Sequence, residues 1–582
     1  MLPRVERKRS LVFATISSEN SSAVTLSSPM PLQMAEKSRG AQTVGLRYWM
    51  LRVLEECDNV AADFRPDPVH DLRVSLRRCR SLADGLMALD PDPNWKAMKK
   101  AGRRLFQRLG DLRDIHVMEE WIDRLDPKTT LQTGGGDREA SLAEVNAELI
   151  ASNSDDLNSG DSSTTANPAD MLRKILELRE QEQKREAKAA VEAFDRKQWK
   201  NWSKTLPARA ARFRLGSALF KHLALERWTE ARELHTRAMR SRSQTALHAL
   251  RIGIKRFRYI VENFLPAEHK LWSDDLKEMQ DLLGEVHDLD VLWSTALSSR
   301  IFPDTQSRRL WHERIAVERK RRIDRYREKM TGPDCLWNAW RAALPQGKQI
   351  EILALRRMKL WAGGLDPDFQ HSERVASFAL QLYDGLLSFS WQPAVDASSA
   401  RSSLLAAALL HDIGKSQGQK NHQKTSLALI RKHRGPLGWK QADLLRAATV
   451  ARFHCGVLPT RKHKLLRDLL PDEQKATIEL VAILRLANAL DAAHDGRILR
   501  LHLQRFHNNG VWPGPKSNGK QAANGLPRRR LALSAHEPLI IAAEGYSPLG
   551  LAAQTIAAER HLLETVLRRP VIVKPMTNPV SR

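Results

Sequence analysis

The chain has 582 residues with 94 lysines and arginines against 68 aspartates and glutamates, which gives a formal net charge of +26 at pH 7. This length accommodates two to four domains, and the charge indicates a polyanionic partner: nucleic acid, an anionic membrane surface or polyphosphate. The four cysteines lie far apart without a CxxC pair, which argues against a disulfide framework or a zinc knuckle and favours a reducing cytoplasm.

Two segments of the chain are expected to be disordered. Residues 1–38 form a tail whose apolar patch, "LVFATI", is shorter than the roughly 7–15 residues of a signal-peptide core. Residues 131–170 are rich in Gly, Ser, Asn and Asp and contain no aromatic residue, so they are expected to form a disordered acidic insert. No apolar run approaches the roughly 20 residues that a membrane helix needs, so we expect no membrane partner.

The rest of the chain reads as mainly α. Apolar residues recur at helical spacing through 39–345 and again through 346–495, which predicts two helical domains. The segment 496–575 contains short β-like runs, "ILRLHLQRF" and "LIIAAEG", separated by the loop Asn508–Pro527. A last helix is expected at Leu549–Leu567, so this segment should be a small α+β C-terminal extension.

An internal repeat predicts the architecture of the first helical domain. "VHDLRVSLRRCRSL", which starts at Val69, resembles "LHALRIGIKRFRYI", which starts at Leu247. Further along, "LGDLRDIHVM" from Leu109 resembles "LGEVHDLDVL" from Leu283, in the same order and at nearly the same offset. Two related elements in one order indicate a duplicated helical bundle with two pseudo-symmetric halves.

Both copies of the first repeated helix carry a cationic stripe. Side chains at i, i+3, i+7 and i+10 fall within roughly an 80° arc, and further cations at i+8 widen it, while Val69, Leu72, Leu76 and Cys79 cover the apolar sector. Like charges at this spacing destabilise a helix by a few tenths of a kcal/mol per pair. The stripe residues are His70, Arg73, Arg77, Arg78 and Arg80 in the first copy and His248, Arg251, Lys255, Arg256 and Arg258 in the second.

A single charged stripe is ordinarily a solvated helix face, but its repetition in a matching register favours a binding surface. Guanidinium forks match phosphate oxygens, and a linear polyanion crossing both stripes would make many salt-sensitive contacts. Nucleic acid is disfavoured as the partner because the stripes lack interleaved aromatic residues, apart from Phe257 and Tyr259, and a groove-reading motif.

These repeats resemble the conserved histidine α-helical domain (CHAD) family, whose repeats read HxLRVxxRRxR followed by LGxxRDxDV. The resemblance implies binding of inorganic polyphosphate by basic residues that line a pore between two helical halves. Carried over by position, it assigns the stripe residues and Arg113 to that site. The second copy has His287 in place of Arg113. It also has Lys255 in place of an arginine, which replaces a planar fork with a point charge.

The second helical domain carries histidines and carboxylates on several separate segments. Imidazole and carboxylate side chains that converge from different helices suit a divalent metal that activates water or binds phosphate. A single His-Asp pair would ordinarily be structural, but several such segments in order favour a site. The residues are His371, His411, Asp412, Lys415, His422, His454, Asn488 and Asp491.

This order resembles the HD superfamily of metal-dependent phosphohydrolases, and in detail the C-terminal HD-like domain of the exopolyphosphatase and guanosine pentaphosphate phosphatase family, Ppx/GppA. The resemblance implies that His371, His411 and Asp412 are metal ligands. It further implies that Lys415, His422 and His454 are catalytic residues that face the metal or the substrate phosphate.

One position of this chain departs from the HD pattern. The motif reads "LRLANALD", so Asn488 stands where the family has its last metal-binding aspartate. A neutral amide oxygen is a weaker ligand than a carboxylate for a hard divalent cation. Asp491, one turn further on, is the alternative metal ligand from this helix.

Two functions follow from the sequence. In the first, a cytoplasmic protein binds polyphosphate, and its HD-like domain uses a divalent metal to hydrolyse polyphosphate, a related phosphoester or a nucleotide phosphate. In the second, the protein is a non-catalytic scaffold on polyphosphate granules with a degenerate HD domain that holds no metal. Metal-dependent release of phosphate separates the two.

Overall fold

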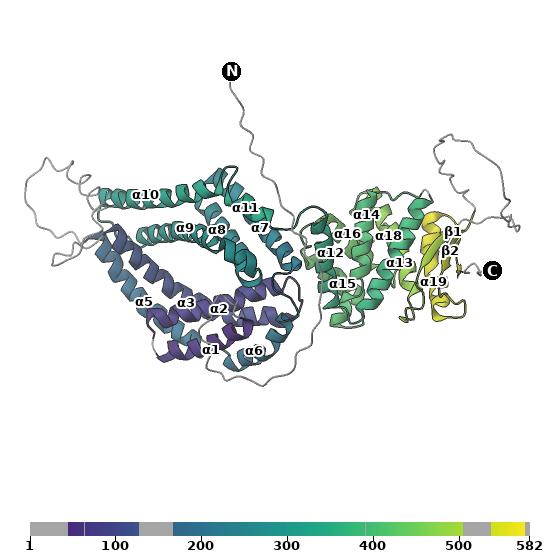
Figure 1. Cartoon of the computed structure of the whole chain (residues 1–582), viewed down its shortest axis with the longest axis horizontal. Coiled ribbons are helices and arrows are strands. Elements are labelled where there is room, and N and C mark those ends of the chain that lie inside the picture. The colour runs from purple at the N-terminus through teal and green to yellow at the C-terminus, as the bar shows by residue number, and fades with distance from the viewer. Residues whose placement is uncertain (1–44, 63, 127–166, 390, 505–536, 577–582) are drawn as a thin grey trace, which may run out of the picture. The chain divides into compact units, whose positions relative to one another are not determined.

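The computed structural model describes residues 45–62, 64–126, 167–389, 391–504 and 537–576 (Figure 1). The expected tail at 1–38, most of the expected insert at 131–170 and the loop Asn508–Pro527 lie outside the described residues. Helices dominate the described part of the chain, and its strands form a single three-stranded sheet, so the expected mainly α fold is confirmed. A search of the described helices finds none that is both long and apolar enough to cross a membrane.

The first helical region consists of two halves, which Figure 1 shows next to each other with α2 and α3 beside α8 and α9. The first half contains α1 (Leu46–Ala62), α2 (Pro66–Leu86), α3 (Pro93–Leu125), α5 (Pro168–Glu192) and α6 (Arg196–Ala210). The second half contains α7 (Ala218–Ser241), α8 (Gln244–Phe264), α9 (Pro266–Ser298), α10 (Thr305–Met330) and α11 (Leu336–Ala342).

The lengths of the helices confirm the duplication. The helices that carry the cationic stripes, α2 and α8, have 21 residues each, and the helices that follow them, α3 and α9, have 33 residues each. Both α3 and α9 begin with proline, which is favoured in the first helical turn because its missing N–H is not needed there.

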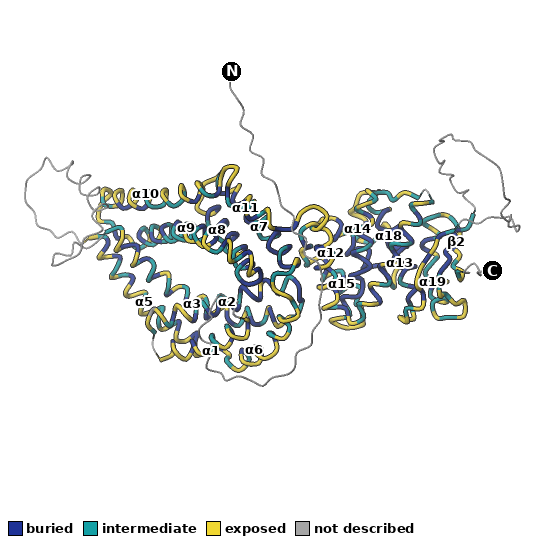
Figure 2. Tube along the Cα trace, viewed as in Figure 1, coloured by how far each residue is buried: buried dark blue, intermediate teal, exposed yellow. Residues whose placement is uncertain are grey.

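The stripes and the core lie on opposite sides of α2 and α8. The apolar residues of both helices belong to one hydrophobic core, as the helical spacing predicts. Figure 2 shows this alternation of buried and exposed faces along the helices. The fully buried side chains are Val69, Leu72, Leu76 and Cys79 on α2 and Leu250, Ile254 and Phe257 on α8.

The second helical region is built around α18, whose side chains are buried on every side from Leu480 to Ala487. A helix that is apolar all round belongs in the middle of a bundle. The helices are α12 (Lys348–Gly363), α13 (Phe369–Ser388), α14 (Ala397–Leu410), the 3-10 helix η1 (Ile413–Gln417), α15 (His422–Lys432), α16 (Gln441–Arg452), α17 (Lys464–Arg467) and α18 (Pro471–Leu490).

The C-terminal segment adds a small sheet to this bundle. Strands β1 (Leu501–Gln504) and β2 (Leu539–Ala543) pair antiparallel, and β2 pairs in parallel with β3 (Val571–Pro575). The helix α19 (Leu551–Leu567) makes the crossover that a parallel pair requires. Strand β3 was not predicted. Buried residues of the sheet and of α19 share one core cluster with the bundle helices.

Candidate cationic groove and metal centre

The cationic stripes of α2 and α8 meet at two adjoining cavities. The larger cavity, of about 540 Å³, and the smaller one, of about 270 Å³, are both lined by Phe106 and Lys255. The two repeats therefore contribute cations to one continuous surface. We call the stripe residues that line it the cationic groove: Arg73, Arg77, Arg80, Arg251, Lys255 and Arg256.

The groove cations form no ion pairs within the described part of the chain. None of the six forms an ion pair with a carboxylate among the residues that the structure describes. The buried Nη1 atoms of Arg73 and Arg80 and the buried hydroxyl of Tyr259, which also lines the larger cavity, have no hydrogen-bond partner there. Each such donor costs about 1–3 kcal/mol when it is left unpaired, so the arrangement calls for acceptors from outside.

The positive charges that act on Lys255 come from both halves of the repeat. Burial lowers the pKa of its ammonium group to about 8, and the positive charges of Arg251, Arg77, Arg73 and Arg80 add to the effect. Burial likewise lowers the pKa of Arg73; the nearby Asp114 opposes this shift and Arg77 adds to it. Since the interacting arginines come from α2 and α8 together, the two stripes point at a common volume.

Features of α3 and α9 make room for the arginines. A Cβ atom at Gly110 would lie 2.8 Å from Arg73 Nη1, and one at the equivalent Gly284 would lie 3.9 Å from Arg251 Nε. In the first repeat Gly110 thus leaves room for Arg73, whereas at Gly284 a Cβ would make only an ordinary contact with Arg251. The ring of Phe106 lies under Arg73 and Arg80, whose guanidinium carbons are 5.4 and 4.7 Å from its centroid.

The two cavities differ in charge. The smaller one also contains the acidic residues Asp111, Asp114 and Asp288. Burial is the main cause that raises the pKa of Asp288 to about 6; Arg251 opposes the shift and Asp114 contributes to it. The larger cavity contains a single acidic residue, Asp84, so its potential is dominated by cations.

Five predicted groove residues lie outside both cavity linings: His70, Arg78, Arg113, His248 and Arg258. The side chain of Arg78 forms an ion pair with Glu262, and that of Arg113 forms one with Glu120 at 3.1 Å.

Of the two predicted histidines, His70 is exposed on α2. The ring of His248 instead contacts that of His287, with 3.3 Å between their Nδ1 atoms. Burial, with Arg251 and His248 adding to it, lowers the pKa of His287 to about 4. The His287 ring is therefore uncharged at neutral pH.

Two cations that the sequence analysis missed line the larger cavity. Lys99 of α3 and Arg227 of α7 join the groove there. Lys99 belongs to a basic run on α3, which was a usable signal. Arg227 lies among acidic residues in the sequence and is recognisable only from the packing of α7 against α8.

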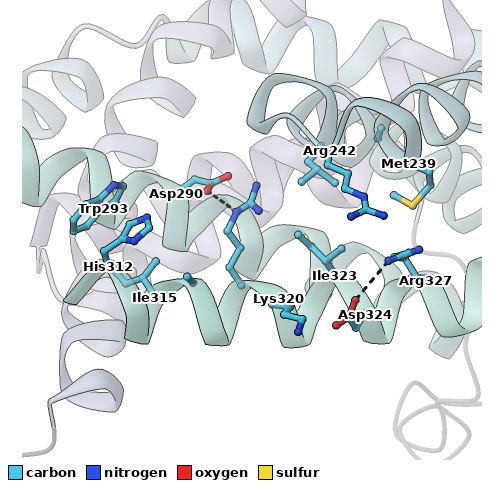
Figure 3. A pocket seen from close by; sticks show the side chains of 14 residues that line it. Met239, Arg242, Asp290, Trp293, His312, Ile315, Lys320, Ile323, Asp324 and Arg327 are labelled. Carbon is cyan, nitrogen blue, oxygen red and sulfur yellow. Dashed lines mark hydrogen bonds and ion pairs between the residues drawn. The ribbon is translucent and has the colours of Figure 1, made fainter. Parts of the chain in front are cut away.

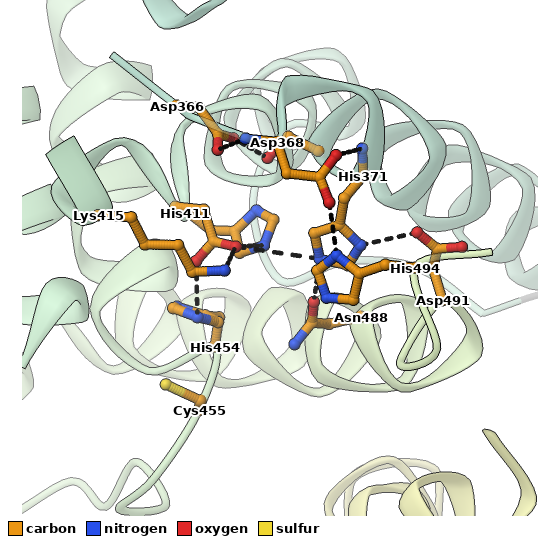
Figure 4. Close-up of polar contacts among 12 residues, drawn as sticks. Asp366, Asp368, His371, His411, Lys415, His454, Cys455, Asn488, Asp491 and His494 are labelled. Carbon is orange, nitrogen blue, oxygen red and sulfur yellow. Dashed lines mark hydrogen bonds and ion pairs between the residues drawn. The ribbon is translucent and has the colours of Figure 1, made fainter. Parts of the chain in front are cut away.

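The second candidate site brings together side chains from separate elements of the second helical region (Figure 4). His371 lies in the first turn of α13, and His411 and Asp412 follow the apolar helix α14. One ligand atom from each of these three buried residues lies within 4.8 Å of the others. The carboxylate Oδ2 of Asp412 is 3.3 Å from His411 Nε2 and 4.0 Å from His371 Nε2.

The turn after α14 fixes His411 in place. Its Nδ1 donates to the carbonyl of Ala408 at 2.7 Å, so its Nε2 presents a lone pair to the centre. Ser426 Oγ donates to the His411 carbonyl at 2.7 Å. A Cβ at Gly414 would lie only 2.1 Å from the carbonyl of His422, so a larger residue would push α15 away.

The same hydrogen-bond pattern recurs at two further histidines. His454 donates from Nδ1 to the carbonyl of Ala451 at 2.7 Å, and His422 donates to that of Gln419 at 3.0 Å. Their Nε2 atoms lie 3.6 and 3.2 Å from Asp412 Oδ1. Three histidine side chains, each anchored at Nδ1 by a backbone carbonyl, therefore face a single carboxylate.

The histidines and a lysine control the ionisation of this carboxylate. Burial acts to raise the pKa of Asp412, but His411, His422 and His454 outweigh it and hold the pKa well below its usual range. Hydrogen bonds to Asp412 and Cys455 raise the pKa of His422 to about 10. Lys415 Nζ donates to Asp412 Oδ2 at 2.5 Å.

Asn488 and Asp491 take different positions around His371. The amide Oδ1 of Asn488 is 3.0 Å from His371 Nε2, on the side of the centre. The carboxylate of Asp491 accepts from His371 Nδ1 at 2.7 Å and from Arg374 Nε at 2.9 Å. Asp491 thus orients the ring through its Nδ1 atom, on the side away from the centre. Asn488 is the α18 side chain that lies next to its Nε2 atom.

These residues fit a divalent metal. The buried His411 Nε2 has no hydrogen-bond partner among the described residues. Two imidazole nitrogens, a carboxylate and an amide oxygen form a donor set that zinc, manganese or iron accepts. A neighbouring set, His422, His454 and Cys455, also has ligand atoms within 4.8 Å of one another. Cys455 was missed because an isolated cysteine carries no spacing signal.

The comparisons with known proteins agree with both regions. Residues 50–297 match the family model of the CHAD domain, and residues 362–513 match that of domain III of the Ppx/GppA phosphatases. Among solved structures, the CHAD domain from the plant Ricinus communis is similar to this chain at 20% identity with a TM-score of 0.30. That match covers 52% of this chain and 90% of the plant domain. None of the curated proteins matches. The chain therefore joins a CHAD domain to a Ppx/GppA domain III.

Proposed function

We propose that this protein binds inorganic polyphosphate in the cationic groove and hydrolyses polyphosphate or a related phosphoester at the HD-like centre. The observation that carries the first part is the convergence of unpartnered cations from both repeats on two adjoining cavities. A polyanion would supply the missing acceptors and offset the repulsion from neighbouring arginines that adds to the effect of burial on the pKa of Lys255.

Polyphosphate fits the groove better than nucleic acid does. Phosphate groups follow one another along a linear chain and can pair with guanidinium groups in both cavities. A single-stranded nucleic acid would also need free aromatic faces for its bases. Phe106 is covered by Arg73 and Arg80, and Phe257 is fully buried.

For the second part, His371, His411, Asp412 and Asn488 would hold a divalent metal. Such an ion supplies a Lewis acid for the phosphoryl oxygen and lowers the pKa of a bound water. The chain's own residues complete the site. Asp491 holds the His371 ring in position, and Lys415, which donates to Asp412, would bind a phosphate oxygen beside it.

The second candidate function is a polyphosphate scaffold without catalysis, and Asn488 is the observation that favours it. Replacing a carboxylate with an amide removes one negative charge from the ligand set and weakens the attraction for a hard cation. Phosphate release from polyphosphate that depends on added metal would support hydrolysis, and its absence would support the scaffold.

The groove is tested by retention of the full chain on immobilised polyphosphate at moderate salt. We expect the variant Arg77→Gln/Arg251→Gln/Lys255→Gln to lose retention with unchanged helical content. The matched control removes three exposed cations outside the groove, Arg237→Gln/Arg240→Gln/Arg308→Gln, and should be retained. Equal retention of both variants would overturn the assignment.

A further inference from the structure

A third cavity lies away from the groove, between the end of α7, the start of α8, and the helices α9 and α10 (Figure 3). Its volume is about 470 Å³, and none of the groove residues lines it. This size falls within the roughly 300–1,000 Å³ that small-molecule sites occupy. Nothing in the proposed polyphosphate binding or hydrolysis uses this cavity.

The two ends of the cavity differ in chemistry. Trp293 and His312 lie together at one end, with their ring centroids 5.0 Å apart. Arg242 and Arg327 lie at the other end, as Figure 3 shows. Between them, α10 contributes apolar side chains such as Ile315.

The positive charge of the cavity is only partly compensated. Arg319 is bound by Asp290 at 2.9 Å, and Arg327 has Asp324 at 3.8 Å. Neither Arg242 nor Lys320, which also lines the cavity, forms an ion pair with any residue in the described ranges. The cavity therefore combines an aromatic end with two cations that are free to bind an anion.

The backbone at Arg242 matters for the choice of a test variant. This residue ends α7 in the left-handed conformation, with φ at 49°. Arg300 and Arg568 share this conformation, so the assignment of Arg242 rests on its place in the cavity lining. Asparagine is favoured at such a helix end and can replace Arg242 without new strain.

An inorganic phosphate chain would leave the aromatic end empty. A nucleotide has a flat base that stacks on an aromatic ring and phosphates that match the cations. His312 and Lys320 are separated by about 12 Å along α10 at a rise of 1.5 Å per residue, which suits a base, a ribose and a phosphate chain.

We propose that this cavity binds a nucleoside polyphosphate, with the base against Trp293 and the phosphates against Arg242 and Lys320. The site is independent of the cationic groove and adds a nucleotide-binding activity to the first helical region. The aromatic end selects for the base, and the cationic end selects for the number of phosphates.

The test is calorimetric titration of the full chain with ATP and, separately, with inorganic tripolyphosphate. The groove triple variant serves as the background, so that tripolyphosphate binding in the groove does not obscure the result. We expect ATP to bind this background at least tenfold more tightly than tripolyphosphate. Arg242→Asn, which keeps a residue suited to the left-handed conformation, and Lys320→Gln should each weaken ATP binding about tenfold.

The control is Arg240→Gln, which removes an exposed cation from the same end of α7 without touching the cavity and should leave ATP affinity unchanged. The proposal is overturned if ATP does not bind at millimolar concentration, if tripolyphosphate binds as tightly as ATP, or if Arg242→Asn and Lys320→Gln bind ATP like their background. Polyphosphate retention by Arg242→Asn in the otherwise unchanged chain should stay normal, which separates failure here from failure of the groove.

Discussion

The cationic groove and the metal centre both bury titratable side chains, but they balance charge in opposite ways. In the groove, burial lowers the pKa of Lys255 to about 8 and arginines from both repeats add to the effect, and none of the groove cations forms an ion pair with a described carboxylate. In the candidate metal centre, three histidines hold the pKa of one carboxylate, Asp412, well below its usual range, and Lys415 donates a hydrogen bond to it. The groove thus needs an anion from outside, whereas the centre holds a negative charge ready for a cation.

The largest effect that could break this comparison concerns the metal. We expect His411→Ala to lower divalent metal affinity by about 100-fold or more, because it removes a buried donor whose Nε2 has no other partner. Elemental analysis after dialysis measures this directly. The matched control is His502→Ala, which removes an exposed histidine on β1. Metal-free wild-type protein would instead favour the scaffold function.

The next effect sharpens the division of roles between Asp491 and Asn488. Asp491→Asn should weaken metal binding about 10- to 100-fold, because it loosens the orientation of the His371 ring. Asn488→Asp should act in the opposite direction, because it restores a charged oxygen beside His371 Nε2. Metal titrations of both variants measure the shifts. Tighter binding in Asp491→Asn would contradict a positioning role for this carboxylate.

A third prediction addresses the cost of the groove. The folded-state pKa of Lys255 is about 8, below its ordinary value of 10.5, so its charged form destabilises the fold at neutral pH. Lys255→Met should therefore raise the free energy of unfolding by about 2 kcal/mol at pH 7. The gain should shrink as the pH rises from about 8 toward 10.5, where the wild-type lysine loses its charge. Polyphosphate affinity should fall about tenfold.

Chemical denaturation with and without polyphosphate measures both changes in Lys255→Met. The exposed Lys270→Met is the control and should alter neither quantity appreciably. If Lys255→Met lowered stability in the absence of polyphosphate, the groove would not be a site of uncompensated repulsion. A substitution that raises the free energy of unfolding but lowers polyphosphate affinity is expected where the bound ligand supplies the missing charge.

Helical periodicity predicted which cations share one face of each helix, but not which other side chains pack against that face. A 100° advance per residue places Arg73, Arg77 and Arg80 on one side of α2, and the repeat places their equivalents on α8. The same rule cannot tell which carboxylates approach from elsewhere. Arg78 lies beside the stripe but pairs with Glu262, and Arg113 pairs with Glu120.

The metal centre shows a similar limit. The spacing of the motifs, with the family resemblance, brought His371, His411, Asp412 and Asn488 together correctly as a set of neighbours. It could not show on which side of the His371 ring Asp491 lies, because α18 ends at Leu490 and the backbone of Asp491, with φ at −111° and ψ at 28°, no longer follows the helix. Strand β3 was missed for a related reason, since a five-residue strand is defined by its pairing with β2.

The smallest predicted effect concerns pH. The pKa of Asp288 is raised to about 6 by burial, so this side chain gains a proton as the pH falls from 7 to 5. The smaller cavity then loses one negative charge, and polyphosphate affinity should rise about threefold at constant ionic strength. In Asp288→Asn the affinity at pH 7 should already be raised by this factor, and its pH dependence should be flatter. Protonation of the polyphosphate ends weakens binding equally in both proteins, so the difference between the two pH profiles isolates the carboxyl group. Parallel profiles would mean that Asp288 does not face the bound polymer.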